Sequence, residues 1–194
     1  MAADDKRRRI LEAAVRVFAE RGYESSRVGD VAREAGVAYG LVYHYFGSKE
    51  AVLDAVFREA WGRLLAALAQ AEETGSGAAE QLALAVRTVL RTWRDDPDLV
   101  RLLVREVIRS PVIRDELDLI GQTFATFERI VERGRAAGEF RRDVDARLAA
   151  FFVYGALEEI LTGWVLGTLP DDADAFAAAE REAIATCVGG LRAS

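Results

Sequence analysis

The chain has 194 residues, a formal net charge of -6, and only one cysteine, one histidine and three prolines. A single cysteine and a single histidine exclude a disulfide framework, a cysteine-based or zinc metal cluster and a catalytic histidine pair, and they fit a reducing cytoplasm. Residues 4–9 are nearly all charged and no apolar run approaches about 18 residues, so we expect neither a secretory signal nor a membrane partner.

The acidic charge is unevenly distributed along the chain. Residues 1–50 carry nine Lys and Arg against eight Asp and Glu, whereas the remainder carries 17 against 24. This distribution argues against a diffuse coating of nucleic acid. It leaves room for a local contact made by the N-terminal part.

Helix-forming residues fill the long stretches between Pro97, Pro111 and Pro170, and no region alternates as a strand does. The sequence therefore predicts an all-α fold. We expect about nine helices, at 4–21, 27–35, 39–45, 49–73, 78–94, 98–109, 112–137, 144–168 and 173–191. The short helices lie before residue 48, which predicts an N-terminal head, 1–48, and a larger body, 49–194.

The first two helices of the head each carry an apolar stripe at helical spacing. In the first helix the stripe comprises Ile10, Leu11, Ala14, Val17 and Phe18, and in the second helix it comprises Val28, Val31, Ala32 and Ala35. Ser26 is placed to cap the second helix, and Asp30 puts negative charge near its positive end. Gly36 can end this helix in the left-handed conformation, and a third helix follows within two or three residues. So short a turn is typical of a helix-turn-helix.

The third helix, 39–45, and Phe46 directly after it are rich in aromatic residues. If Val42 and Phe46 face inward, the outward residues are Tyr39, Gly40, Tyr43 and His44. Phenol and imidazole groups can donate to phosphate oxygens, and a glycine lets the backbone approach a base closely. Lys49, one of only two lysines, could reach a phosphate as a point charge.

Four runs in the first 50 residues resemble the N-terminal signature of the TetR family of bacterial regulators. They are Ile-Leu-Glu-Ala-Ala at 10–14, Phe-Ala-Glu-Arg-Gly-Tyr at 18–23, Val-Ala-Arg-Glu-Ala-Gly-Val at 31–37 and Val-Tyr-His-Tyr-Phe-Gly-Ser-Lys-Glu at 42–50. The resemblance implies base reading by Tyr39 and Gly40, a DNA contact by Tyr43 and a phosphate clamp at Lys49.

Two positions depart from the family pattern. Ser26 and Arg27 match a pair that usually reads threonine-threonine and holds phosphate, and Arg27 either adds a charged phosphate contact or lies in solvent. Ala38 stands where the family often has a capping serine. His44 is either a phosphate contact or a surface residue, and the basic run 6–9 is either a solvated helix start or an arm that meets DNA.

The body is expected to supply a dimer interface. The resemblance implies that the last two helices meet their copies as a four-helix bundle, which places the two heads roughly 34 to 36 Å apart on a pseudo-palindromic operator. The predicted interface residues are Phe152, Ala156, Ile160, Trp164, Ile184, Val188 and Leu191.

The resemblance also implies a small-molecule effector that binds in the body and weakens the operator complex. The candidate lining residues, each of which could equally be ordinary core, are Trp61, Leu65, Leu90, Trp93, Leu103, Val107, Phe124, Phe127 and Phe152. Residues 138–145 are similar to regulators of fatty-acid metabolism within the family, which bind long-chain acyl-CoA. The effector is thus either an acyl-CoA or another apolar or amphipathic molecule.

The sequence as a whole predicts a homodimeric DNA-binding transcriptional regulator, most simply a repressor, in the cytoplasm of a bacterium. The sequence offers no nucleophile paired with a base and no set of metal ligands. We therefore expect no enzyme, no cofactor and no metal. The alternative is a helical ligand-binding or interaction module without DNA binding. Its only support is the acidic charge, and Tyr43 and Lys49 argue against it.

Overall fold

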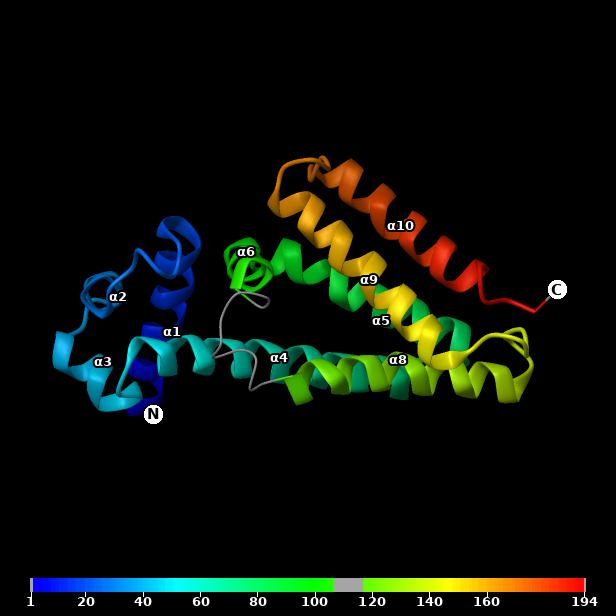
Figure 1. Ribbon diagram of the computed structural model, residues 1–194, viewed down its shortest axis with the longest axis horizontal. Helices are drawn as coiled ribbons and strands as arrows, with labels where there is room; N and C mark the ends of the chain where they lie inside the picture. Colours follow the sequence, from blue (N-terminus) through cyan, green and yellow to red (C-terminus); the bar gives the residue numbers. More distant parts are fainter. Residues whose placement is uncertain (1, 107–116, 194) are drawn as a thin grey trace. The chain divides into compact units, whose positions relative to one another are not determined.

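The computed structural model describes residues 2–106 and 117–193, and this part of the chain is built from α-helices (Figure 1). The helices are α1 (Ala2–Arg21), α2 (Val28–Ala35), α3 (Tyr39–Phe46), α4 (Lys49–Thr74), α5 (Ala78–Asp95), α6 (Pro97–Glu106), α8 (Leu117–Ala137), α9 (Ala146–Val165) and α10 (Ala173–Gly189). The predicted all-α class is confirmed. The helix ends predicted at 109 and 112, and Val107, lie outside the described residues.

The largest difference in helix bounds concerns α9, which is shorter than predicted at both ends. It begins at Ala146 rather than 144 because the carboxylate of Asp145 caps it, accepting a hydrogen bond from the amide of Leu148 at 2.8 Å. It ends at Val165 rather than 168, since Gly167 adopts the left-handed conformation with a φ of 68°. Capping and glycine chemistry thus set both bounds.

The chain divides into two compact units. The first, Met1–Trp61 with Asp96–Leu117, holds α1, α2, α3, the start of α4 and α6, and the second, Gly62–Asp95 with Asp118–Ser194, holds the other helices. This division by compactness falls within α4. The functional division between a head, 1–48, and a body, 49–194, remains a proposal.

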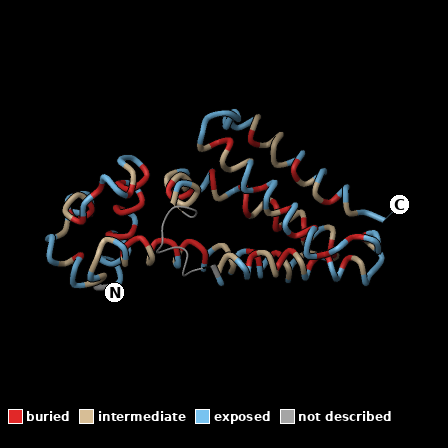
Figure 2. Tube along the Cα trace, viewed as in Figure 1, coloured by how far each residue is buried: buried red, intermediate tan, exposed pale blue. Residues whose placement is uncertain are grey.

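In the first unit α1 packs on both α2 and α6. Its predicted apolar stripe is buried, with Ile10 at 0% and Phe18 at 1% exposure, and Leu53 and Phe57 of α4 are completely buried as well. Figure 2 shows the buried stretches along α1 and the start of α4. The ring of Tyr23, just after α1, packs edge-on against Phe18 with ring centroids 5.3 Å apart. Burial of these side chains supplies the main force that holds α2 and α3 in place.

In the second unit α5 packs against α9 and α10. Trp93 of α5, Trp164 of α9 and Phe176 of α10 form a ring stack, with centroids 6.3 and 5.2 Å apart. Glu180 of α10 adds ion pairs with two arginines of α5. Three helices are therefore joined through one aromatic cluster.

The segment between α8 and α9 makes contacts that stabilise this unit. The carboxylate of Glu139 accepts hydrogen bonds from the amides of Ala78 and Ala79, each at 3.0 Å, and so caps α5. The next side chain, Phe140, is completely buried, and a Cβ on Gly134 would lie 2.1 Å from its ring. This segment therefore has a structural role that is independent of any ligand.

Replacing Glu139 by alanine should lower the free energy of unfolding by about 1 to 2 kcal/mol, because two first-turn amides of α5 lose their acceptor and the helix dipole loses a negative partner. Urea unfolding followed by circular dichroism measures the change. Glu132→Ala on the exposed face of α8 is the matched control, with an expected change below about 0.5 kcal/mol. Equal stability of the two variants would show that the cap contributes nothing.

One described helix, α9, is long and apolar enough to cross a membrane by length and composition alone, as core helices of soluble proteins also are. Arg147, Glu158 and Glu159 interrupt its apolar sequence, and the expectation of no membrane partner stays a prediction. One side is buried, with Val153 and Leu157 at 4% and 0% exposure, whereas Leu148 and Phe152 on the other side are 60% and 77% exposed. The exposed side carries large apolar side chains of the kind that mark an interaction surface.

Candidate nucleic-acid interface

Helices α2 and α3 are joined by a tight turn at Gly36. This residue has a φ of 64°, and the amide of the following Val37 donates to the carbonyl of Ala32 at 3.0 Å, as expected for a left-handed helix end. The guanidinium of Arg9, on α1, donates to the carbonyl of Ala35 at 2.7 Å and fixes the turn from outside. The role of Gly36 was predicted from the sequence, whereas the role of Arg9 was not.

The predicted outward face of α3 is exposed. Tyr39 and Tyr43 are 56% and 42% exposed, large values for aromatic residues, while Val42 on the opposite face is 1% exposed. Gly40 and His44 are exposed too, and a Cβ on Gly40 would meet no atom within 4 Å. Packing within the protein therefore gives no reason for a glycine there, whereas close approach of an external partner does.

The two exposed tyrosines act as a pair. The hydroxyl of Tyr39 donates to that of Tyr43 at 3.1 Å, and their rings lie 5.0 Å apart. This hydrogen bond, with partial desolvation, raises the pKa of Tyr43. The Tyr43 phenol thus keeps its proton at neutral pH and can donate it to an acceptor outside the protein.

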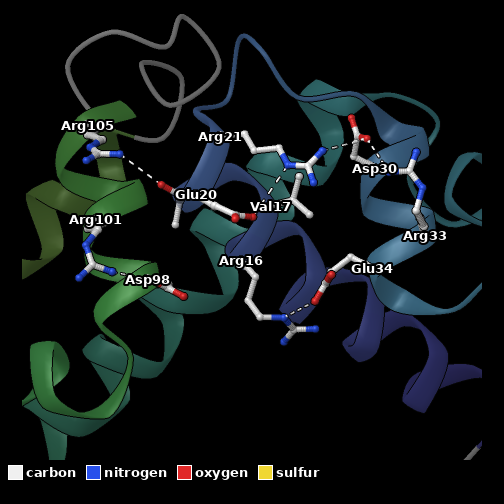
Figure 3. Close-up of a pocket in the computed structure, with 11 residues that line it drawn as sticks. Arg16, Val17, Glu20, Arg21, Asp30, Arg33, Glu34, Asp98, Arg101 and Arg105 are labelled. Carbon is white, nitrogen blue, oxygen red and sulfur yellow. Dashed lines mark hydrogen bonds and ion pairs between the residues drawn. The ribbon is translucent and has the colours of Figure 1, made fainter.

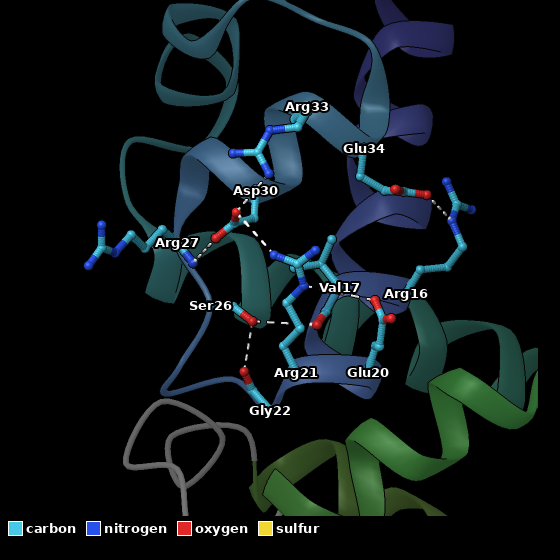
Figure 4. Close-up of polar contacts among 10 residues, drawn as sticks. All are labelled: Arg16, Val17, Glu20, Arg21, Gly22, Ser26, Arg27, Asp30, Arg33 and Glu34. Carbon is cyan, nitrogen blue, oxygen red and sulfur yellow. Dashed lines mark hydrogen bonds and ion pairs between the residues drawn. The ribbon is translucent and has the colours of Figure 1, made fainter.

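The structure corrects the predicted cap of α2. Ser26 is 2% exposed, and its hydroxyl donates to the carbonyl of Gly22 at 2.7 Å instead of capping the helix (Figure 4). The N-cap residue is Arg27, which makes no side-chain cap hydrogen bond. A hydroxyl buried in this way does not favour a DNA contact by Ser26.

Asp30, rather than Ser26, makes the side-chain hydrogen bond at the start of α2. Its carboxylate accepts a hydrogen bond from the amide of Arg27 at 3.0 Å. It also pairs with Arg21 and Arg33, both at 3.2 Å. The backbone hydrogen bond, followed by the two arginines, lowers the pKa of Asp30. The guanidinium of Arg27 points away from this cluster (Figure 4), and among the described residues it has no hydrogen-bond or ion-pair partner.

The side chain of Lys49 turns back into the first unit. Its ammonium donates to the carbonyls of Tyr23 and Ser26 at 3.0 and 3.2 Å, and it lies 4.2 Å from the centre of the Tyr23 ring. The expected phosphate clamp at Lys49 thus stays a prediction that this geometry does not favour. The basic helix start is partly engaged as well, since Arg7 pairs with Glu59 at 3.2 Å and Arg8 with Asp5 at 2.9 Å.

A groove of about 620 Å³ lies between α1, α2 and α6 in the first unit (Figure 3). Five arginines and four carboxylates line it. They face one another, as Arg16 and Glu34 do at 2.8 Å, and Arg105 of α6 donates to the carbonyl of Ala19 at 3.2 Å. None of the residues predicted for the effector pocket lines this groove.

The predicted effector residues occupy both units. Leu90, Trp93 and Phe127 are buried in the second, while Trp61 is buried in the first against Phe57. Half-buried positions are held by Leu65, Leu103 and Phe124. Phe152 requires a correction, because α9 turns it outward to 77% exposure and it lines no interior space in the protomer.

The predicted interface residues also separate into two groups. The first group is accessible in the single protomer, as residues of an interface must be. Phe152 and Ala156 are exposed, and Ile160, Ile184 and Leu191 are half-buried. Trp164 and Val188 are 3% and 6% exposed and therefore belong to the protomer's own core, which corrects their assignment. The prediction also missed three exposed residues of the same face, Leu148, Phe151 and Leu166.

No group of three or more His, Cys, Asp and Glu residues within residues 2–106 and 117–193 is arranged to hold a metal ion. Cys187 is half-buried, and burial raises the pKa of its thiol. The exposed groups of the candidate site on α2 and α3 are hydroxyl, imidazole, amide and guanidinium groups.

Two family models together match most of the chain. "Bacterial regulatory proteins, tetR family" matches residues 10–56, and "YsiA-like protein, C-terminal region" matches residues 57–184. The fatty acid metabolism regulator protein of Bacillus subtilis is 31% identical over 81% of this chain and 82% of its own length. The transcriptional repressor KstR2 of Rhodococcus jostii is 28% identical over 76% and 74%.

Solved structures show the same likeness. The fatty acid degradation regulator FadR of Bacillus halodurans superimposes with a TM-score of 0.85, at 28% identity, covering 95% of this chain and 98% of that one. FadR of Bacillus subtilis, solved in complex with stearoyl-CoA, gives a TM-score of 0.84 at the same identity and coverage.

Proposed function

Because this chain belongs to the TetR family of bacterial transcriptional regulators, we propose that it is a cytoplasmic repressor that binds a pseudo-palindromic operator as a homodimer and is released by a fatty acyl-CoA. The observation that carries this proposal is the exposed face of α3. Two large aromatic residues and a glycine with no packing role stand there directly after a helix-turn-helix turn.

The proposed contact with DNA divides between α3 and the start of α2. Tyr43 donates to a phosphate or base, while Tyr39 and the backbone at Gly40 approach base edges in the major groove. His44 adds a phosphate contact beside them. The amide of Asp30 donates to the carbonyl of Arg27 at 2.9 Å, whereas those of Val28 and Gly29 have no acceptor within their own helix, so these two amides and Arg27 can hold the next phosphate.

The exposed apolar face of α9 supports the proposed dimer. Phe151 and Phe152 are 52% and 77% exposed, and Ala156 one turn further on allows close helix approach. A two-fold interface formed by α9 and α10 with their copies would cover these side chains. It would also present two α3 helices to successive major grooves, roughly 34 Å apart.

The relatives support the choice of effector. The C-terminal model matches 128 residues, 57–184, and the similar Bacillus subtilis regulator was solved with stearoyl-CoA. For an acyl-CoA to release the operator, it must bind the DNA-free form more tightly than the DNA-bound form, and DNA must weaken acyl-CoA binding by the same factor. This reciprocity gives the proposal a quantitative test.

The purified protein first selects a duplex from a random-sequence pool. Fluorescence anisotropy then measures the affinity of the protein for this duplex. We expect salt-sensitive binding to a pseudo-palindrome and at least about a tenfold loss of affinity with saturating stearoyl-CoA, within the usual range of coupling between sites. Coenzyme A and stearate alone are the controls. If no duplex is enriched, the chain is a module without DNA binding, and if stearoyl-CoA leaves the affinity unchanged, the proposed effector is wrong.

A further inference from the structure

The ammonium of Lys49 is surrounded by backbone carbonyls. It lies 3.0 Å from the carbonyl oxygen of Tyr23, 3.2 Å from that of Ser26 and 3.5 Å from that of Glu24, with the Tyr23 ring on another side at 4.2 Å. An ammonium has three hydrogens to donate, and three acceptors are present here. The group is therefore already solvated by the protein itself.

These carbonyls belong to the connection between α1 and α2. The segment is not helical, so its carbonyls have no helical partners, and the hydroxyl of Ser26 satisfies one more of them at Gly22. Lys49 is the first residue of α4. It therefore ties the beginning of α4 to the residue that directly precedes the N-cap of α2.

We propose that Lys49 is a positioning residue, which holds the connection at Tyr23–Ser26 so that α2 begins in the right place, and that Arg27 makes the charged contact to a DNA phosphate. The inference rests on the proposed DNA binding. Arg27 is the N-cap residue of α2, its side chain is exposed, and its guanidinium has no partner among the described residues. Its planar fork also suits a phosphate better than an ammonium does.

The two side chains differ in what a phosphate contact would cost them. Lys49 would have to give up its carbonyl contacts and the face of the Tyr23 ring in exchange for one phosphate. Arg27 would give up only water. The phosphate contact therefore favours Arg27, and the loop contact favours Lys49.

Salt dependence separates the two roles. Each phosphate contact contributes about -0.9 to the slope of log affinity against log salt concentration, so a contact made in both protomers contributes about -1.8. The duplex is the one selected by the wild-type protein, titrated at several salt concentrations. The variants are Lys49→Met, Lys49→Arg and Arg27→Met, and Arg142→Met, an exposed arginine of the second unit, controls for loss of charge.

We expect Arg27→Met to reduce the steepness of the slope by about 1.8, whereas both Lys49 variants lose about tenfold in affinity with the slope unchanged. Arginine at position 49 keeps the charge but cannot gather three donors around one point, so it should not rescue binding. Hydrogen exchange in the free protein should become faster at residues 22–31 in both Lys49 variants, with residues 10–20 unaffected in Lys49→Arg.

A slope that falls by about 1.8 in Lys49→Met, together with rescue by arginine, would overturn the proposal and make Lys49 a phosphate ligand. Unchanged exchange at residues 22–31 in both variants would overturn it as well. The exchange measurement needs no DNA. Failure of the wild-type protein to bind any duplex would contradict the proposed function without deciding the role of Lys49 in holding the loop.

Discussion

Tyr43→Ala is expected to weaken operator binding by roughly 30-fold or more, because a good contact to DNA contributes about 1 to 3 kcal/mol and the dimer makes it twice. The side chain is 42% exposed, and its hydrogen-bond partner Tyr39 is exposed as well, so little stability depends on it. Fluorescence anisotropy with the selected duplex measures the affinity. Size-exclusion chromatography with light scattering checks that the dimer persists.

Two further variants distinguish the contribution of the Tyr43 hydroxyl to DNA affinity from that of the Tyr43 ring. Tyr43→Phe removes the donor but keeps the aromatic surface, and Tyr39→Phe removes the hydroxyl that bonds to Tyr43 at 3.1 Å. If the phenol donates to DNA, Tyr43→Phe should lose a large part of the affinity that Tyr43→Ala loses. An unchanged affinity in Tyr43→Ala, or a lost dimer, would remove Tyr43 from the proposed interface.

The helices and the head's core were predictable from the sequence because they depend on local chemistry. The apolar stripe that contains Ile10 and Phe18 repeats at helical spacing, and only a glycine adopts a φ of 64° easily at position 36. The outward face of α3 followed from the inward position of Val42. Each of these inferences needs only neighbours within one or two helical turns.

The roles of Ser26 and Lys49 were not predictable in this way. A serine before a helix can cap it or turn inward, and the choice depends on carbonyls of Val17 and Gly22 at the end of another helix. Lys49 meets carbonyls 23 to 26 residues earlier in the chain, at the end of a flexible side chain. Spacing along the sequence does not encode either contact.

The dimer face was predicted only in part, because α9 is apolar nearly all round. A helix of this kind has no polar side to show which direction faces the core. Trp164 and Phe152 are both large aromatic residues of α9, yet one is 3% and the other 77% exposed. The difference follows from Trp93 and Phe176, which lie on other helices and stack with Trp164.

Phe152→Glu is expected to dissociate the proposed dimer. In a two-fold interface each substitution occurs twice, and loss of a central aromatic residue costs about 2 kcal/mol or more per copy, so dimer affinity should fall roughly 1,000-fold. Sedimentation equilibrium measures this change. The helix content of the monomer at 25 °C should stay close to the wild-type value, because the ring makes few contacts within its own protomer at 77% exposure.

Operator binding should fall with the dimer, since a monomer holds only one half-site and loses the gain in effective concentration from the second. Ala136→Glu, which adds the same charge at an exposed position of α8, should leave both the dimer and the affinity intact. A Phe152→Glu protein that remains dimeric would place the interface elsewhere. A monomer that still binds the duplex with wild-type affinity would mean that the two heads do not act together, and the operator would then need no two-fold symmetry.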